Sequence, residues 1–155
     1  YNEAVREASV VVLAVPFGAA EAALKECGNL SGKIVVDATN PLAMTPAGLG
    51  VTVGFETSGA EIIAGFLNGG KLVKCFNTTG FATMADPRGS MMFVCGDDSE
   101  ANETVRRLSD EIGFETLNIG NLTKARLLEP LAMLWIHLAF TSELKRNFAF
   151  TISKR

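Results

Sequence analysis

The residues best suited to chemistry lie in three short segments, each directly after an apolar, strand-like run. The segments are residues 14–17, 39–42 and 77–80. The second begins with Thr39 and Asn40, and the third holds an asparagine and two threonines, whose amides and hydroxyls can hold a ligand by hydrogen bonds. In open α/β sheets, ligands bind outside the carboxyl ends of the strands. We therefore expect the three segments to line one cleft that binds and orients a ligand.

Groups that usually carry hydrolytic or metal chemistry are few and scattered. His137 is the only histidine, and its apolar helical surroundings favour a buried or interface position over a catalytic one. One histidine and three separated cysteines give no metal-ligand spacing, so no metal site is predicted. No serine has an evident histidine partner, which argues against a hydrolase triad. Asp37 ends a strand-like run, where we favour a structural role in which it bonds the backbone of Thr39 or Asn40.

The elements that must position these segments alternate between strands and helices. Apolar runs predict five strands, at residues 10–14, 33–37, 72–76, 91–95 and 115–119. Periodicity and capping residues predict helices at residues 2–8, 19–27, 57–67, 99–112 and about 123–142. Ser99 is the expected N-cap of the fourth helix and Gly113 its end. This alternation is typical of an α/β fold with a mostly parallel sheet.

Two strands carry more specific expectations. The first is a continuous run without alternation, which predicts a strand buried on both faces. The third and fourth strands are joined by residues 77–90, which hold two glycines and a proline and show no helical period. Because a parallel crossover usually carries a helix, the fourth strand should run antiparallel to the third.

Composition and charge restrict the class of protein. The 155 residues (16.5 kDa) are 48% hydrophobic and 20% charged, as in folded globular chains. The net charge is −3 and no basic block occurs, which argues against nucleic acid or an anionic membrane as partner. The longest apolar runs are too short to span a bilayer. Three cysteines without a C-x-x-C motif predict small buried residues in a reducing compartment, the cytoplasm.

Four motifs, each modest alone, occur together and in order. They are residues 35–42 (VVDATNPL), 73–80 (VKCFNTTG) continuing to 84–87 (MADP), 94–98 (VCGDD) and 122–131 (LTKARLLEPL). With them the chain resembles the NADP-dependent deazaflavin-coenzyme oxidoreductase family, and it is similar to the soluble reductase domain of six-transmembrane metalloreductases. The resemblance covers essentially the whole chain. It implies a Rossmann-like three-layer sandwich that binds NADP(H), with one or two antiparallel strands at the C-terminal side of the sheet.

One part of the family's pattern is missing here. Members begin with a β-α-β unit that carries a glycine-rich turn for the pyrophosphate. This sequence has no G-x-G-x-x-G, and its only G-x-G, Gly48-Leu49-Gly50, lies in a loop and not after a predicted strand. We therefore expect an incomplete form of the fold without the first β-α-β unit, and a chain that binds NADP(H) weakly or not at all by itself.

The resemblance gives each of the three segments a role. Cofactor-binding roles fall on Ala14, Val15, Pro16, Phe17, Thr39, Asn40 and Pro41. Roles toward the second redox partner fall on Asn77, Thr78, Thr79 and Gly80. The family's deazaflavin enzymes often have a histidine in the latter loop, where this chain has Phe76-Asn77. Flavin, 8-hydroxy-5-deazaflavin and a small organic acceptor therefore all stay open, and no residue receives a catalytic role.

The implied activity is hydride transfer between nicotinamide and this acceptor, by an NADP(H)-dependent oxidoreductase. One alternative is a non-catalytic dinucleotide-binding or sensing module, which the same loops would suit. Another is a doubly wound domain of a different class, such as a flavodoxin-like module, for which residues 15–18 (VPFG) make a poor phosphate loop.

The last helix suggests how the chain assembles. We expect a single partial domain over residues 1–155, with the sheet core in 1–120 and a helix and tail in 121–155. This helix is apolar nearly all round, so it must be buried on nearly all sides. We expect a homodimer contact through it; the alternative is that a missing N-terminal unit or the tail from residue 147 covers it.

Overall fold

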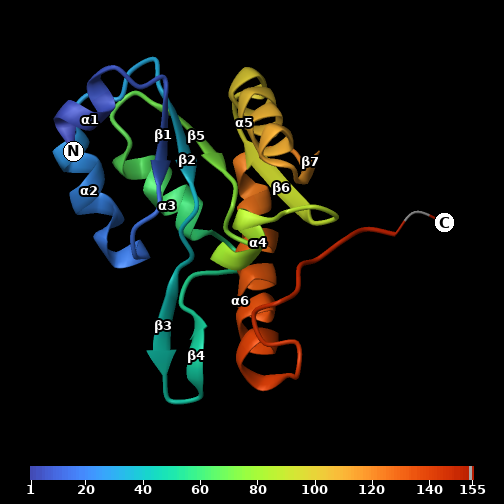
Figure 1. The fold of residues 1–155 in the computed structure, drawn as a ribbon. Coiled ribbons are helices and arrows are strands. Elements are labelled where there is room, and N and C mark those ends of the chain that lie inside the picture. The colour runs from blue at the N-terminus through green and yellow to red at the C-terminus, as the bar shows by residue number, and fades with distance from the viewer. Residues whose placement is uncertain (154) are drawn as a thin grey trace.

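The computed structural model describes residues 1–153 and 155, and a five-stranded sheet forms its centre (Figure 1). The strands are β1 (Val10–Leu13), β2 (Ile34–Asp37), β5 (Lys71–Lys74), β6 (Met91–Gly96) and β7 (Glu115–Asn118). Their order in the sheet is β1-β2-β5-β6-β7. The first three are parallel, β6 is antiparallel to β5, and β7 is parallel to β6. The predicted α/β sheet with antiparallel strands on its C-terminal side is confirmed.

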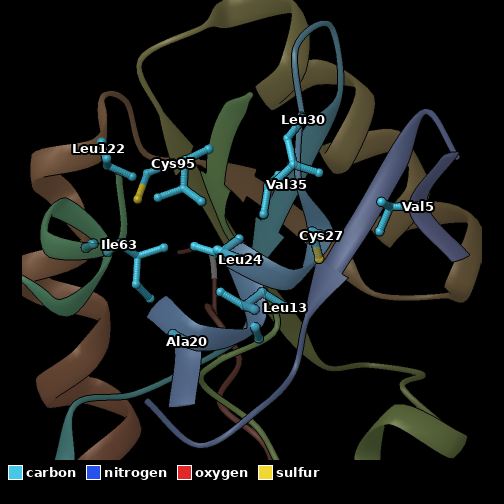
Figure 2. Packing of buried hydrophobic residues seen from close by; sticks show 14 of the residues in the cluster. Val5, Leu13, Ala20, Leu24, Cys27, Leu30, Val35, Ile63, Cys95 and Leu122 are labelled. Atoms are coloured by element: carbon cyan, nitrogen blue, oxygen red, sulfur yellow. The ribbon is translucent and has the colours of Figure 1, made fainter. Parts of the chain in front are cut away.

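Helices cover both faces of this sheet. They are α1 (Asn2–Arg6), α2 (Ala20–Cys27), α3 (Gly59–Phe66), α4 (Phe81–Ala85), α5 (Ser99–Ile112) and α6 (Ala125–Thr141), with short 3-10 turns at Phe17–Ala19 and Leu122–Lys124. Successive strand residues point to opposite faces. Val35 and Leu72 join one core with α2 and α3 (Figure 2), whereas Val36 and Val73 join a second core beneath α5. The result is the expected three-layer sandwich.

The first strand is less buried than predicted. β1 lies at the edge of the sheet, and Val12 is 52% exposed. Its neighbours Val11 and Leu13 face the core under α2 and α3, so Val12 faces the other side. The α5 core reaches β1 only at Val10, near the start of the strand. The prediction of burial on both faces is therefore wrong at Val12.

Two short elements interrupt stretches that the sequence pattern left without structure. β3 (Leu42–Thr45) and β4 (Gly48–Val51) form an antiparallel hairpin that extends away from the main sheet (Figure 1). The Thr45 hydroxyl donates to the Gly48 carbonyl at 2.8 Å, and Gly48 adopts φ +104°, so a glycine suits this turn. The other addition is α4, a single turn inside the 77–90 connection.

The ends of α5 show how local signals specify a helix. Gly113 ends it in the left-handed conformation, as predicted. The N-cap is one residue earlier than expected, because the Asp98 carboxylate, and not the Ser99 hydroxyl, accepts from the Ala101 amide at 2.8 Å.

Helix α6 buries one face and leaves apolar residues on another. Its buried apolar residues are Ala125, Leu128, Ala132, Trp135 and Ala139, whereas Leu127, Leu134 and Phe140 are exposed. His137 is also exposed, which excludes burial within the chain; the other predicted position, at an interface, stays a prediction. The tail covers Trp135: Phe148 stacks on the indole with ring centroids 5.3 Å apart, and its carbonyl accepts from Trp135 Nε1 at 3.0 Å. Among the described residues, none of the helices has the length and apolar character needed to cross a membrane.

Candidate functional site

The register of the parallel strands brings the three candidate segments to one edge of the sheet. Leu13 pairs with Asp37, and Asp37 pairs with Lys74, so β1, β2 and β5 end side by side. The chain leaves the sheet directly after each of these residues. This confirms that the three segments share the carboxyl edge; their role in binding stays a prediction.

A reciprocal pair of asparagines joins the second and third segments. Asn40 Nδ2 donates to the Asn77 carbonyl at 3.0 Å, and Asn77 Nδ2 donates to Asn40 Oδ1 at 3.0 Å. The Asn77 amide also donates to the Leu128 carbonyl of α6 at 3.2 Å. Two amides that bond each other and a helix backbone hold both loops in one arrangement.

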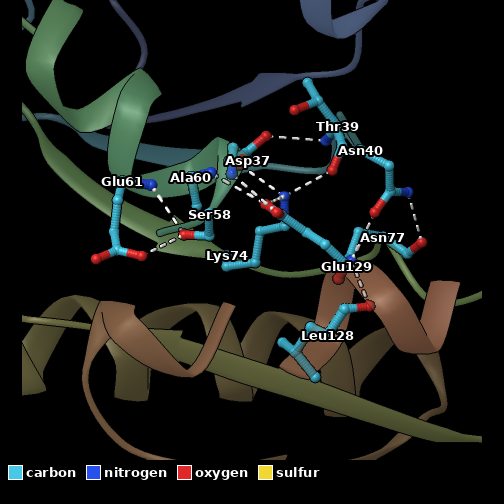
Figure 3. A network of polar contacts seen from close by, with 11 residues as sticks. Asp37, Thr39, Asn40, Ser58, Ala60, Glu61, Lys74, Asn77, Leu128 and Glu129 are labelled. Carbon is cyan, nitrogen blue, oxygen red and sulfur yellow. Dashed lines mark hydrogen bonds and ion pairs between the residues drawn. The ribbon is translucent and has the colours of Figure 1, made fainter. Parts of the chain in front are cut away.

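A buried ionic triad lies next to this pair (Figure 3). The Lys74 ammonium donates to Asp37 Oδ2 at 2.9 Å, to Glu129 Oε1 at 3.0 Å and to the Thr39 carbonyl at 2.6 Å. All three charged side chains are at most 1% exposed. Asp37 Oδ1 also accepts from the Thr39 amide at 2.8 Å, which is the predicted structural role of Asp37.

The first turn of α3 supplies the remaining hydrogen bonds of the triad. Glu129 accepts from the Gly59 amide at 2.8 Å and from the Ala60 amide at 3.0 Å. These amides belong to the positive end of the helix dipole, which suits a carboxylate. Asp37 and Glu129 therefore share one ammonium, and Glu129 alone also accepts from the helix N-terminus.

A second link joins the same two helices at the surface. Arg126 of α6 donates to both carboxylate oxygens of Glu61, at 2.9 and 2.6 Å, and Glu61 in turn accepts from the Ser58 hydroxyl that caps α3. The hydrogen-bonded Arg126 guanidinium holds the pKa of the Glu61 carboxyl below its ordinary value. The start of α6 is thus anchored to the start of α3 twice.

Gly59 is the point where the first two segments meet α3. A Cβ at this position would lie 2.9 Å from Phe17 Cε2, 3.1 Å from Pro41 Cδ and 3.1 Å from Glu129 Oε1. Glycine suits this convergence, because a Cβ would be too close to the Phe17 ring and would force Pro41 and Glu129 to move by a few tenths of an ångström.

Substituting Gly59 should therefore disturb the packing of side chains at the carboxyl edge of the sheet. We expect Gly59→Ala to lower the free energy of unfolding by roughly 1–3 kcal/mol, because the added methyl must displace an aromatic ring, a proline and a buried carboxylate. Gly65→Ala is the matched control: it lies in the same helix with nothing within 4 Å of an added Cβ, and it should be neutral or stabilising. Urea denaturation of both variants measures the difference, and equal stabilities would refute this packing.

The remaining predicted site residues differ in where their side chains lie. Thr39, Pro41 and Asn77 are buried, Asn40 and Thr79 are half-buried, and Ala14 and Pro16 are exposed. Thr78 is buried as well, and its hydroxyl lies 3.9 Å from Met92 Sδ, so it faces the core beneath α5 and not the asparagine pair.

Two cavities border the second and third segments. One, of about 660 Å³, is lined mainly by the loop after β4 and the start of α6, with Thr52, Phe55 and Leu127 among its walls. Thr52 donates both its amide and its hydroxyl to the Pro41 carbonyl, which connects this cavity to the second segment. The other, of about 150 Å³, includes Gly80 and Trp135.

The cysteines provide no nucleophile at this edge. Cys27, Cys75 and Cys95 are all free and buried. Burial raises the pKa of the Cys75 thiol and that of the Cys95 thiol, the latter to about 12, so both stay protonated at neutral pH. Among the described residues, no three His, Cys, Asp or Glu side chains are grouped to hold a metal ion.

Comparison with known proteins relates the chain to a family. Residues 1–41 match the family described as NADP oxidoreductase, coenzyme F420-dependent. A solved structure of a proposed F420-dependent NADP-reductase from Arthrobacter sp. FB24 superposes with a TM-score of 0.88 at 32% identity, over 98% of this chain and 73% of that one. The chain belongs to the coenzyme F420-dependent NADP oxidoreductase family.

Two curated relatives extend the comparison. The F420-dependent NADP reductase of Methanocaldococcus jannaschii is 32% identical over 144 residues, which are 88% of this chain. Metalloreductase STEAP3 of Rattus norvegicus is 32% identical over 135 residues, or 85% of this chain. The chain spans 65% of the length of the first relative and 26% of the second.

Within this family member, the residues that sequence reasoning missed are Lys74 and Glu129. Lys74 sits in a strand among apolar residues, and Glu129 precedes a proline in an apolar helix. A charged residue inside a buried pattern needs a partner, which is the one signal that could have singled them out. Lys74 lies 37 positions from Asp37 and 55 positions from Glu129, so no local sequence pattern links the three residues.

Proposed function

We propose that this chain forms the nicotinamide-facing side of an oxidoreductase that transfers a hydride between NADP(H) and a deazaflavin of the coenzyme F420 type. The observation that carries the proposal is the Asn40–Asn77 pair, which fixes two segments together where three parallel strands end. Both cofactors, NADP and coenzyme F420, are named in the descriptions of the Methanocaldococcus and Arthrobacter relatives.

Three unsatisfied oxygens support a ligand at this edge. Thr39 Oγ1, Asn77 Oδ1 and Thr79 Oγ1 are buried and have no hydrogen-bond partner among the residues that the structure describes. A buried acceptor without a donor costs about 1–3 kcal/mol, so three such oxygens in the segments that follow β2 and β5 favour a ligand that would bond them. The carboxamide and ribose hydroxyls of a nicotinamide nucleoside are donors of the missing kind. The residues therefore fit the nicotinamide end, and no glycine-rich turn in this sequence fits the pyrophosphate.

The role of the protein in such a reaction is orientation. The bound cofactors themselves supply the hydride chemistry. Asn40 and Asn77 would hold the carboxamide side of the nicotinamide, and residues 14–17 would border its ribose. Residues 77–80 would face the acceptor and, with the neighbouring apolar walls, exclude water. A site of amides and hydroxyls suffices for this, because aligning two reactants removes much of the barrier without an acid or base.

Transfer of a labelled hydride tests this proposal. The protein is mixed with oxidised coenzyme F420 and millimolar NADPH deuterated at C4, and the reduced deazaflavin is analysed by mass spectrometry. We expect deuterium in the deazaflavin, and Asn77→Ala should reduce the rate about tenfold or more, since it removes both bonds that align the loops. Asn68→Ala, an exposed asparagine at the opposite edge of the sheet, should leave the rate unchanged. Binding of NADPH without transfer would instead favour a sensing module.

We also propose a homodimer through α6, in a reducing compartment such as the cytoplasm. The exposed apolar residues Leu127, Leu134 and Phe140 support the contact, and the three free cysteines support the compartment. Leu134→Glu should then convert dimers to monomers in sedimentation experiments. An unchanged sedimentation coefficient would exclude this face.

A further inference from the structure

We infer that Asp37, Lys74 and Glu129 are positioning residues, which set the backbone of Thr39 and through it the face offered to nicotinamide. The inference rests on the proposed function and concerns residues that the family resemblance left without a role.

The backbone of Thr39 is held on both sides by this triad. Its amide donates to Asp37 Oδ1 at 2.8 Å, and its carbonyl accepts from Lys74 Nζ at 2.6 Å. Hydrogen bonds to ionised groups are about twice as strong as neutral ones. Two such bonds on one residue fix the direction in which the chain leaves β2, and Asn40 follows immediately.

Stability alone is a weak reason for such a triad. Burying three charges costs several kcal/mol per ion before they attract each other, and apolar replacements of buried ion clusters are often neutral or stabilising. Here the charged side chains are at most 1% exposed, and Lys74 bonds the Thr39 carbonyl of the candidate site. Apolar core residues in these positions could not bond the amide and the carbonyl of Thr39, as the triad does.

Helix α6 connects the triad to the other half of the site. Glu129 holds Lys74, and the preceding Leu128 carbonyl accepts from Asn77 Nδ2 (Figure 3). Adjacent residues of one helix therefore hold both the 39–41 and the 77–80 segments. The spacing between these segments depends on the placement of a single helical turn.

A pair of variants separates positioning from stability. Lys74→Met removes the donor to the Thr39 carbonyl and leaves two buried carboxylates uncompensated. Adding Glu129→Gln to Lys74→Met removes one of these charges, so it should recover much of the lost stability without restoring the donor. Asn102→Ala is the matched control, since Asn102 is buried and its side-chain amide donates to the Gly96 and Gly120 carbonyls, and not to Thr39 or a residue of the triad.

The first readout needs no ligand. In the double variant, we expect the carbonyl carbon resonance of Thr39 to shift, and its amide to exchange with solvent about tenfold faster relative to the Val36 amide. In Asn102→Ala, both should stay as in the parent apart from global stability. If Thr39 and Val36 change in equal proportion in the double variant, the triad does not position Thr39 and the inference is overturned.

The second readout is the affinity for reduced nicotinamide mononucleotide. It should fall about tenfold in the double variant and stay constant in Asn102→Ala. Recovery of affinity together with stability would assign the triad a purely structural role and overturn the inference, with the proposed function intact. If the parent chain shows no binding at millimolar ligand, the proposed function is overturned. The part of the inference that concerns nicotinamide then fails with it, and only the positioning of the Thr39 backbone by Asp37 and Lys74 remains.

Discussion

Replacing Lys74 by methionine should lower the free energy of unfolding by about 3–5 kcal/mol. The ammonium is fully buried and is the only cation in contact with Asp37 and Glu129 among the described residues. Without it, two carboxylates remain in a low-dielectric interior, where only the Thr39 amide and the first turn of α3 still bond them. Few other single side chains in this chain compensate so much buried charge.

The matched control for this prediction is Lys25→Met. Lys25 also pairs with a carboxylate, Glu21, at 2.6 Å, but the two side chains are 73% and 47% exposed. An exposed pair contributes about 0–1 kcal/mol, so Lys25→Met should be nearly silent. Urea denaturation with unchanged m-values compares the two. A loss below about 1 kcal/mol for Lys74→Met would mean that the triad is not buried as described.

Removing the indole of Trp135 should cost a similar amount, about 3–5 kcal/mol. Trp135 is 7% exposed, stacks on Phe148 with an interplanar angle of 19°, and donates to the Phe148 carbonyl. Trp135→Ala leaves a cavity and also releases the tail segment that lies over α6. Gly80 packs against the same indole, since a Cβ added there would lie only 2.5 Å from Trp135 Cη2. The 77–80 segment should therefore become more mobile as well.

Two measurements check the Trp135 prediction. Chemical denaturation should show the loss of stability, and limited proteolysis should cut near residue 148 much faster in Trp135→Ala than in the parent. The control is Met44→Ala: Met44 lies in the β3 strand with its side chain 77% exposed, and its substitution should change neither by much. Equal cleavage rates in all three proteins would show that the tail is not held by the indole.

Much of the fold follows from local sequence signals. The short apolar runs of β1 (VVVL) and β2 (IVVD) are rich in β-branched residues, which favour strands, whereas β5, β6 and β7 hold one such residue each and are predicted from their apolar runs and the turn residues around them. The antiparallel pairing of β6 with β5 is predicted because residues 77–90 show no helical period, and the structure places only the single turn of α4 there. The end of α5 follows from Gly113, whose φ of +115° few other residues adopt.

The parts that sequence could not provide depend on distant partners. The structural bond of Asp37 to Thr39 spans two residues and was predictable, whereas its ion pair with Lys74 spans 37. The exposure of Val12 depends on which elements cover the edge strand, and the exposure of His137 on which face of α6 meets the sheet. The hairpin β3–β4 has glycines at two of its eight strand positions, so no alternating pattern announced it.

The most direct test of the proposed nicotinamide site is to map a nicotinamide ligand onto the chain. An isotope-labelled protein is titrated with reduced nicotinamide mononucleotide and, separately, with NADPH, while the backbone and asparagine amide resonances are followed by NMR. We expect the largest shifts at Thr39, Asn40, Asn77 and Thr79, and dissociation constants weaker than micromolar that agree within about threefold for the two ligands, because no glycine-rich turn here holds the pyrophosphate. If the largest resonance shifts lie at the amino edge of the sheet, or if NADPH alone binds with micromolar affinity, the proposed nicotinamide site at the carboxyl edge is contradicted.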